Sequence, residues 1–235
     1  MRSSYDSSVA TVGAVLWRQV APICLAYALV GISFGAITVS AGIPGWVAPA
    51  MSAAVFAGSA QFAAIGIVMG GGGLVAAILA GLVINARMLA YGIAVADATG
   101  RHRWHRFFGA HLITDVNTAL VLGVSDPCRR RRLFWGAGGL IFVCWNMAVL
   151  AGVMLGDHLG DVHALGLDAV LPTILLALVA DALHGARVRA AVGAGALASL
   201  AGLVVLPPGW PVLASLLGCT VLAWPCRRPG WQGRP

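Results

Sequence analysis

Apolar runs long enough to cross a lipid bilayer follow one another along most of this chain of 235 residues. A helix of about 20 apolar residues spans the hydrocarbon core, where each backbone polar group must find its partner within the segment. We therefore expect an all-α, polytopic bundle of about seven or eight transmembrane helices. The candidate segments cover residues 20–41, 46–70, 74–97, 107–125, 133–156, 168–186, 190–206 and 210–225.

The composition leaves little material for a soluble domain. Hydrophobic residues make up 60% of the chain and charged residues only 10%, whereas soluble domains carry about 25% charged residues. We expect one transmembrane domain over residues 20–225. It would lie between an N-terminal tail at 1–19 and a C-terminal tail at 226–235, both cytoplasmic.

The kinds of charged residue exclude several chemistries for this chain acting alone. All 15 cationic residues are Arg and all 8 acidic residues are Asp. Without Lys there is neither a P-loop lysine nor a Schiff-base lysine, and without Glu there is no H-E-x-x-H zinc site. The 5 cysteines show no C-x-x-C spacing, so a metal site is not indicated. We expect no cofactor, no bound metal and no enzymatic activity.

The arginines lie in short clusters between apolar runs, a pattern that indicates membrane topology and not a nucleic-acid surface. With eight spans in a bacterial cytoplasmic membrane and both termini inside, the clusters at 129–132 and 187–189 lie in the cytoplasm. The cluster at 101–106 then lies outside. In one alternative, segment 46–70 is re-entrant, which returns 101–106 to the cytoplasm but moves 129–132 out.

Two ionisable residues fall near the centres of apolar segments. Arg87 lies deep in 74–97, and Asp115 lies near the middle of 107–125. Each costs about 2.5–3.5 kcal/mol to insert, so each is expected to face the bundle interior and to have a partner. The two residues are candidates to pair with each other. Such a pair either fixes helix register alone, or holds a substrate carboxylate at Arg87 and a proton or ammonium at Asp115.

Segment 107–125 carries a polar stripe if it is one continuous helix. His111, Asp115 and Thr118 are spaced i, i+4 and i+7 and would share one face. A polar face on an apolar helix indicates a water-lined path or a seam against another helix. His111 is then either part of the path of a coupling ion or a histidine at the membrane interface.

Small and polar residues interrupt segment 46–70 at positions 56–62, with the sequence FAGSAQF. One interpretation is close packing of neighbouring helices. The other is a discontinuous helix, whose free N–H groups and positive end bind a substrate carboxylate. Gly58 would then supply backbone, Ser59 a hydroxyl and Gln61 an amide. Asn85, within a turn of Arg87, would orient it.

Five motifs, in order along the chain, resemble the AzlC-type branched-chain amino-acid permeases, the large subunits of the AzlC/AzlD transporter family. They are FAGSAQF at 56–62, NARMLAYG at 85–92, LITD at 112–115, GLDAVLP at 166–172 and LPP at 206–208. The resemblance covers nearly the whole chain. One departure is Asn117, where we expect an acidic or aromatic residue.

The resemblance implies a secondary transporter subunit that exports branched-chain or related hydrophobic amino acids together with a small, AzlD-like membrane subunit. The candidate substrate-binding residues are Gly58, Ser59, Gln61, Asn85 and Arg87, and the candidates for the coupling ion or proton are Asp115 and His111. Two other classes remain open, an intramembrane enzyme and a channel or scaffold subunit. The first needs a nucleophile–base or metal constellation, and this sequence shows no paired intramembrane Asp and no His cluster.

Overall fold

The computed structural model describes residues 18, 20–100, 102–159, 183, 185–207 and 210–218. These residues form helices, turns and loops, and none of them forms a strand. The predicted tail at 226–235 and nearly all of the tail at 1–19 and of segment 168–186 lie outside the described residues.

The helices confirm the predicted all-α, polytopic fold. Four described stretches are long and apolar enough to cross a membrane, namely Ala21–Ser40, Leu74–Ala94, Pro127–Gly156 and Ala186–Val205. The helices are α2 (Ala21–Ser40), α3 (Val47–Ala54), α4 (Gly58–Met69), α5 (Leu74–Asn85), α6 (Arg87–Ala94), α7 (Ala96–Thr99), α8 (Arg103–His111), α9 (Asp115–Leu122), α10 (Pro127–Leu159), α12 (Ala186–Val205), α13 (Trp210–Ala214) and a 3-10 turn, η2 (Ser215–Leu217).

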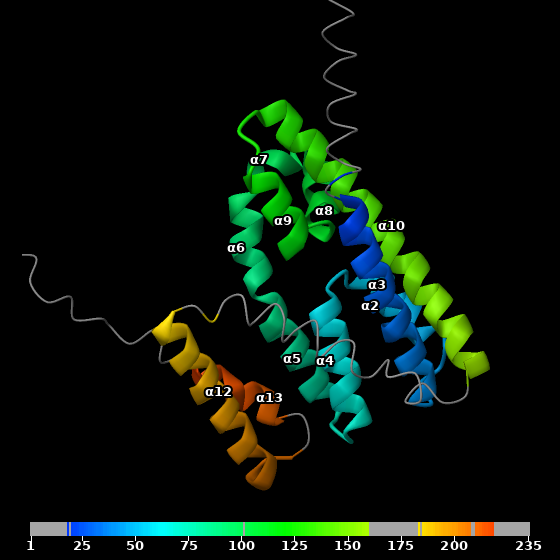
Figure 1. Ribbon diagram of the computed structural model, residues 1–235, viewed down its shortest axis with the longest axis vertical. Coiled ribbons are helices and arrows are strands. Elements are labelled where there is room, and N and C mark those ends of the chain that lie inside the picture. Colours follow the sequence, from blue (N-terminus) through cyan, green and yellow to red (C-terminus); the bar gives the residue numbers. More distant parts are fainter. Residues whose placement is uncertain are drawn as a thin grey trace, which may run out of the picture.

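Helices α2 and α10 lie side by side and run in the same direction (Figure 1). The Cys144 thiol donates a hydrogen bond to the Cys24 carbonyl at 3.1 Å near the start of the contact. Further along, a Cβ on Gly156 would come within 3.0 Å of the Ala36 backbone. Small residues at this interface let the two backbones approach closely, which is how helices associate tightly in a membrane.

Segment 46–70 is discontinuous, as predicted, and it is also re-entrant. Just before α3, Gly45 lies beside Val153, near the end of α10. After α3 the chain reaches the middle of α10, where the Phe56 ring lies 5.1 Å from that of Phe142. Helix α4 turns back beside α3 and connects through a short loop to α5 (Figure 1). The first hairpin (α3–α4) therefore enters and leaves the bundle at the same end.

Segment 107–125 forms a second re-entrant hairpin (α8–α9), so the predicted single helix with His111, Asp115 and Thr118 on one face is wrong. Helix α8 ends at His111 and α9 restarts at Asp115. The Asn117 side-chain amide holds the break, because it donates to the Leu112 carbonyl at 3.0 Å and to the Phe134 carbonyl at 3.2 Å.

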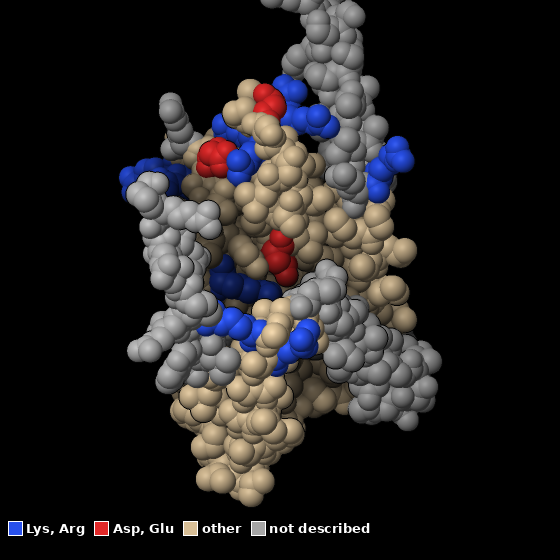
Figure 2. Space-filling view, turned by 60° about the vertical axis from the view of Figure 1, so that its left-hand side comes forward, with Lys and Arg blue, Asp and Glu red and all other residues tan. Residues whose placement is uncertain are grey.

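The second hairpin brings two arginine clusters to one end of the molecule. Arg130 lies 3.3 Å from the Asp97 carboxylate and donates to the Ala94 carbonyl at 2.9 Å. Figure 2 shows charged side chains gathered at this end. The predicted separation of 101–106 from 129–132 is therefore wrong, because 107–125 turns back instead of crossing. The alternative in which 46–70 is re-entrant was right about that segment. It was wrong to place 129–132 at the end opposite to 101–106.

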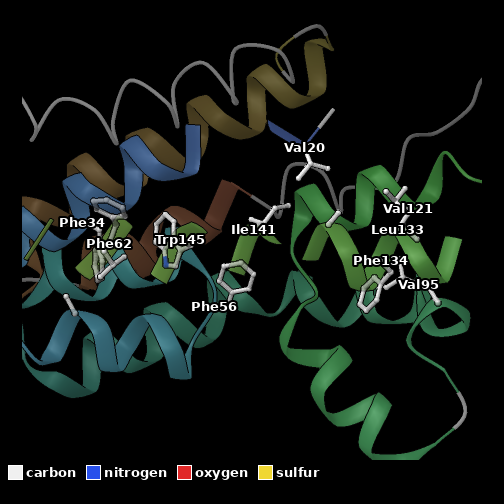
Figure 3. Packing of buried hydrophobic residues seen from close by; sticks show 14 of the residues in the cluster. Val20, Phe34, Phe56, Phe62, Val95, Val121, Leu133, Phe134, Ile141 and Trp145 are labelled. Atoms are coloured by element: carbon white, nitrogen blue, oxygen red, sulfur yellow. The ribbon is translucent and has the colours of Figure 1, made fainter. Parts of the chain in front are cut away.

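The core joins both hairpins to α2 and α10. Figure 3 shows Phe34, Phe62 and Trp145 in one group and Val121, Leu133 and Phe134 in another, with Ile141 between them. A smaller cluster of Ile67, Ala76, Ala77 and Ala80 joins α4 to α5, and Leu213 of α13 packs against it. Many large apolar side chains on the outside are exposed, among them Leu25, Leu29, Leu82, Leu89 and Ile93. Such a surface suits contact with lipid.

Candidate functional site

The tips of the two hairpins meet in the middle of the bundle. The ring of Phe56, at the first tip, lies 6.4 Å from that of His111, at the end of α8. Helices α4 and α9 both begin at these tips and run outward to opposite ends (Figure 1). Two helix N-termini, each with a partial positive charge, therefore point into the same interior region.

Arg87 connects the two tips. The helix is interrupted at Ala86, between α5 and α6, and Arg87 is the first residue of α6. Its Nη2 donates to the Ser59 hydroxyl at 2.9 Å and lies 3.8 Å from Oδ2 of Asp115. The predicted pairing of Arg87 with Asp115 is confirmed. The two side chains keep 38% and 34% exposure, so a ligand can reach the pair.

The N-terminus of α4 has no side-chain cap. The N–H groups in the first turn of any helix have no helical acceptor, and here no side chain replaces it. The first bond of this helix runs from the Gln61 N–H to the Ala57 carbonyl at 3.0 Å. Gly58 lies against Trp145, and a Cβ there would come within 3.0 Å of the indole ring. This end of α4 is polar, positive and closely packed, and it adjoins Arg87 through Ser59.

The N-terminus of α9 is satisfied by its own residues. The Thr114 hydroxyl accepts from the Asn117 N–H at 3.1 Å as an N-cap. Oδ1 of Asp115 accepts from the Val116 N–H at 3.1 Å. An acidic residue in the first turn also offsets the positive helix end. The second hairpin therefore brings a negative charge to the site.

The other two predicted substrate-binding residues face a separate cavity. Gln61 is 0% exposed, and neither of its amide atoms has a hydrogen-bond partner among the described residues. Oδ1 of Asn85 is likewise buried without a partner there. Both residues line a cavity of about 530 Å³ between α3, α4 and α5. The predicted set thus divides into Ser59 with Arg87 on one side and Gln61 with Asn85 on the other.

His111 packs against aromatic rings. Its ring lies 5.4 Å from that of Phe142, close to Phe56. His111 ends α8 and Asp115 begins α9, so the two residues do not share one helix face as the sequence predicted. His111 contributes to the contact between the two tips, and Asp115 contributes to the pair with Arg87.

Two polar residues at the site were missed as site residues. Tyr27 of α2 lies close to Thr114 and Asp115, and its ring packs edge-on against that of Trp145 at 5.7 Å. A tyrosine in the middle of an otherwise apolar run was the available signal. Asn117 holds the second break open; the sequence marked it only as a departure from the family pattern, which does not locate a break. Among the described residues, no three His, Cys or Asp side chains gather into a metal site.

Comparisons with known proteins find related membrane proteins. The profile of the family described as AzlC protein matches residues 22–159. A Helicobacter pylori protein described as an uncharacterized membrane protein is 27% identical over 158 residues, which cover 66% of this chain and 69% of the relative. An Archaeoglobus fulgidus protein with the same description is 28% identical over 206 residues, covering 86% and 90% of the two chains. No solved structure matches the chain.

Proposed function

This chain belongs to the AzlC family of membrane proteins, and from that premise we propose that it is a secondary transporter subunit for branched-chain or related hydrophobic amino acids. The transport is outward across a bacterial cytoplasmic membrane. A small, AzlD-like membrane protein is its partner subunit.

The observation that carries this proposal is the set of groups between the hairpin tips. An amino acid is a zwitterion and needs a cation and an anion a few ångströms apart. Arg87 and Asp115 supply them, and they lie 3.8 Å from each other. Ionisable residues held within a membrane domain are costly and mark transport paths by default. We assign the substrate carboxylate to Arg87, Ser59 and the N–H groups that follow Gly58, and the substrate ammonium to Asp115.

The 3.8 Å separation also suits exchange of partners. It is longer than a well-formed charge-assisted hydrogen bond of about 2.7–2.9 Å. A bound zwitterion replaces this loose contact with two shorter ones. When the substrate leaves and Asp115 is ionised, Arg87 and Asp115 neutralise each other again, so neither charge is left alone in the bundle.

The energy source we propose is an ion or proton gradient. A proton that crosses the membrane potential contributes about 2.3 kcal/mol per 100 mV, and Asp115 is the group we assign to carry it. His111 is the second candidate, from its place at the contact of the two tips.

The orientation follows from the arginines. One end of the molecule carries Arg103, Arg106 and the cluster at 129–132, whereas the loops at 41–46 and 70–73 of the other end contain no charged residue. Cytoplasmic loops are enriched in Arg. We therefore place the second hairpin on the cytoplasmic side and the first hairpin on the outer side.

The test is flux of labelled leucine and valine in membrane vesicles that contain the chain with and without the small partner. Arg87→Gln and Asp115→Asn are each expected to lower gradient-dependent flux by about 10- to 100-fold, because each leaves one end of the zwitterion unpaired. Arg103→Gln, an exposed change at the cytoplasmic end, is the matched control and keeps the flux.

Two results would count against the proposal. If gradient-dependent flux is absent under every condition, the chain is not a secondary transporter subunit. Restored flux in the exchange variant, Arg87→Asp with Asp115→Arg, shows that the pair only fixes the helices, because a zwitterion would then have to bind in reverse.

A further inference from the structure

The cavity between α3, α4 and α5 has the form of a small-molecule site. Its volume of about 530 Å³ lies in the range of about 300–1,000 Å³ typical of ligand pockets. Most of its wall is aliphatic, with Ile43, Met51, Ile65 and Ile78 among the lining residues. It runs from Ile43 and Leu74 near the loops to Val55 and Gln61 at the tip of the first hairpin, and its lining does not include Arg87 or Asp115.

A polar end is built into this apolar wall by two side-chain amides. Gln61 is fully buried, yet both of its amide atoms lack a hydrogen-bond partner among the described residues. Asn85 lines the same cavity, and its buried Oδ1 lacks a partner as well. Buried polar atoms are normally satisfied, and one that is not calls for an explanation such as a ligand. Together the amides offer donors and acceptors to one guest.

The wall of the cavity excludes a charged guest. None of the described lining residues is charged, and an ion without a counter-ion in an apolar site loses far more hydration energy than it recovers. A purely aliphatic guest would leave the amides unpaired. The guest that fits both conditions is uncharged, with one hydrogen-bonding head and an aliphatic body.

The cavity is accessible from the side of the bundle. Leu74, Ile78 and Leu82 line it, and their exposures are 72%, 61% and 63%. In a bilayer these side chains face the hydrocarbon region. A guest that partitions into lipid can therefore reach the cavity without passing the ion pair.

We propose that the cavity is a second binding site, separate from the Arg87–Asp115 pair, for a small uncharged amphiphile with a carboxamide or hydroxyl head and an aliphatic body. Gln61 and Asn85 bind the head. The aliphatic residues of α3, α4 and α5 enclose the body.

The test uses the full-length purified chain in lipid nanodiscs and hexanamide as the probe, with saturable binding measured by the dose-dependent rise of the thermal unfolding midpoint. Hexanamide has no carboxylate, so its binding is independent of the proposed amino-acid site. Hexanoate at pH 8 has a similar body and a negative head. We expect saturation with hexanamide and none with hexanoate.

Two variants test the location of binding. Gln61→Leu removes one amide, and the expected loss of affinity is about tenfold. The variant folds at least as well as the parent, because the change removes a buried polar group that lacks a partner. Gly81→Leu fills the cavity directly: Gly81 lines it, and a Cβ there meets nothing within 4 Å. We expect this variant to lose binding.

The matched controls are Gly66→Leu and Arg87→Gln. A Cβ on Gly66 also meets nothing within 4 Å, but Gly66 is not a lining residue of the cavity. Both control variants keep hexanamide binding if the site is the cavity. The proposal is overturned by non-saturable uptake, by equal binding in all variants, or by loss of binding in Arg87→Gln alone.

Discussion

The first and second hairpins have the same plan and opposite electrostatics. Each enters the bundle from one end, breaks in the interior and returns to the end where it began (Figure 1). The second helix of each hairpin starts at the break. In α9 this start is capped by Thr114 and carries Asp115, whereas in α4 it has neither a cap nor an acidic residue.

This difference explains how two similar hairpins make one asymmetric site. The N-terminus of α4 retains its partial positive charge. The N-terminus of α9 carries a negative side chain that offsets the partial positive charge of that helix. Arg87 lies between them and contacts Ser59 of the first and Asp115 of the second. A zwitterion can be oriented in such a site, because one tip attracts its carboxylate and the other its ammonium.

Asn117→Leu is expected to have the largest effect, because it removes what holds the second break. Asn117 is 0% exposed, and its amide donates to two backbone carbonyls. Loss of both bonds is expected to lower the free energy of unfolding by about 2–4 kcal/mol, measured by thermal unfolding in detergent.

Asn146→Leu is the matched control for that variant. Among the described residues, the Asn146 amide bonds to the Phe142 carbonyl within its own helix and to no other group, so its loss is expected to lower stability by less than about 1 kcal/mol. If the two variants were equally stable, the Asn117 bonds would not hold the second hairpin.

Gly58→Ala tests the tip of the first hairpin. The new Cβ would lie 3.0 Å from the Trp145 indole, which is held by the rings of Tyr27 and Phe34. Overpacking of this kind is expected to lower the unfolding free energy by about 1–3 kcal/mol. Trp145→Phe in the same chain shortens the ring and should relieve the clash. Because Trp145→Phe also leaves a gap of its own, the cost of Gly58→Ala is compared in the two backgrounds. If Gly58→Ala lowered the unfolding free energy as much in the Trp145→Phe background as in the parent chain, the clash would lie elsewhere.

Thr114→Ala compared with Ser59→Ala contrasts the two N-termini directly. Thr114 caps α9, so its loss is expected to lower the unfolding free energy by about 1 kcal/mol. Ser59 caps nothing and bonds Arg87, so its loss should reduce leucine affinity more than stability. The contrast would fail if Ser59→Ala lowered the unfolding midpoint as much as Thr114→Ala.

Asp97→Asn is expected to have the smallest effect. Its pair with Arg130 joins α7 to α10, but the Asp97 side chain is 55% exposed, and exposed ion pairs contribute about 0–1 kcal/mol. The small loss of stability should vanish in high salt. A loss well above 2 kcal/mol, measured by the same unfolding assay, would show that this pair holds the second hairpin in place.

The sequence predicted the residues of the site better than their grouping. Arg87 and Asp115 were found because ionisable groups stand out in apolar segments, and the break near 56–62 because small and polar residues interrupt a run. Ser59 and Gln61 lie in one turn of α4, and Asn85 and Arg87 lie on either side of Ala86. Packing decides which member of each pair faces the cavity. That is why Gln61 and Asn85 could not be separated from Ser59 and Arg87 by sequence alone.

The second break had no comparable local signal. Residues 112–114 contain neither Pro nor Gly, and the break depends on Asn117, which also reaches the Phe134 carbonyl of another helix. Length was misleading as well, because two short helices in one hairpin have the same number of residues as one span. The arginines at 101–106 were therefore separated from those at 129–132, although both groups lie at the same end.

The most direct test of the two-hairpin architecture is the sidedness of the four loops at the ends of the hairpins. In a cysteine-free background, single changes Trp46→Cys and Gly73→Cys flank the first hairpin, and Arg103→Cys and Ser125→Cys flank the second. A membrane-impermeant maleimide should label 46 and 73 from one side, and 103 and 125 from the other. Labelling of 46 and 73 from opposite sides, or of 103 and 125 from opposite sides, would contradict the re-entrant hairpins and the site built between their tips.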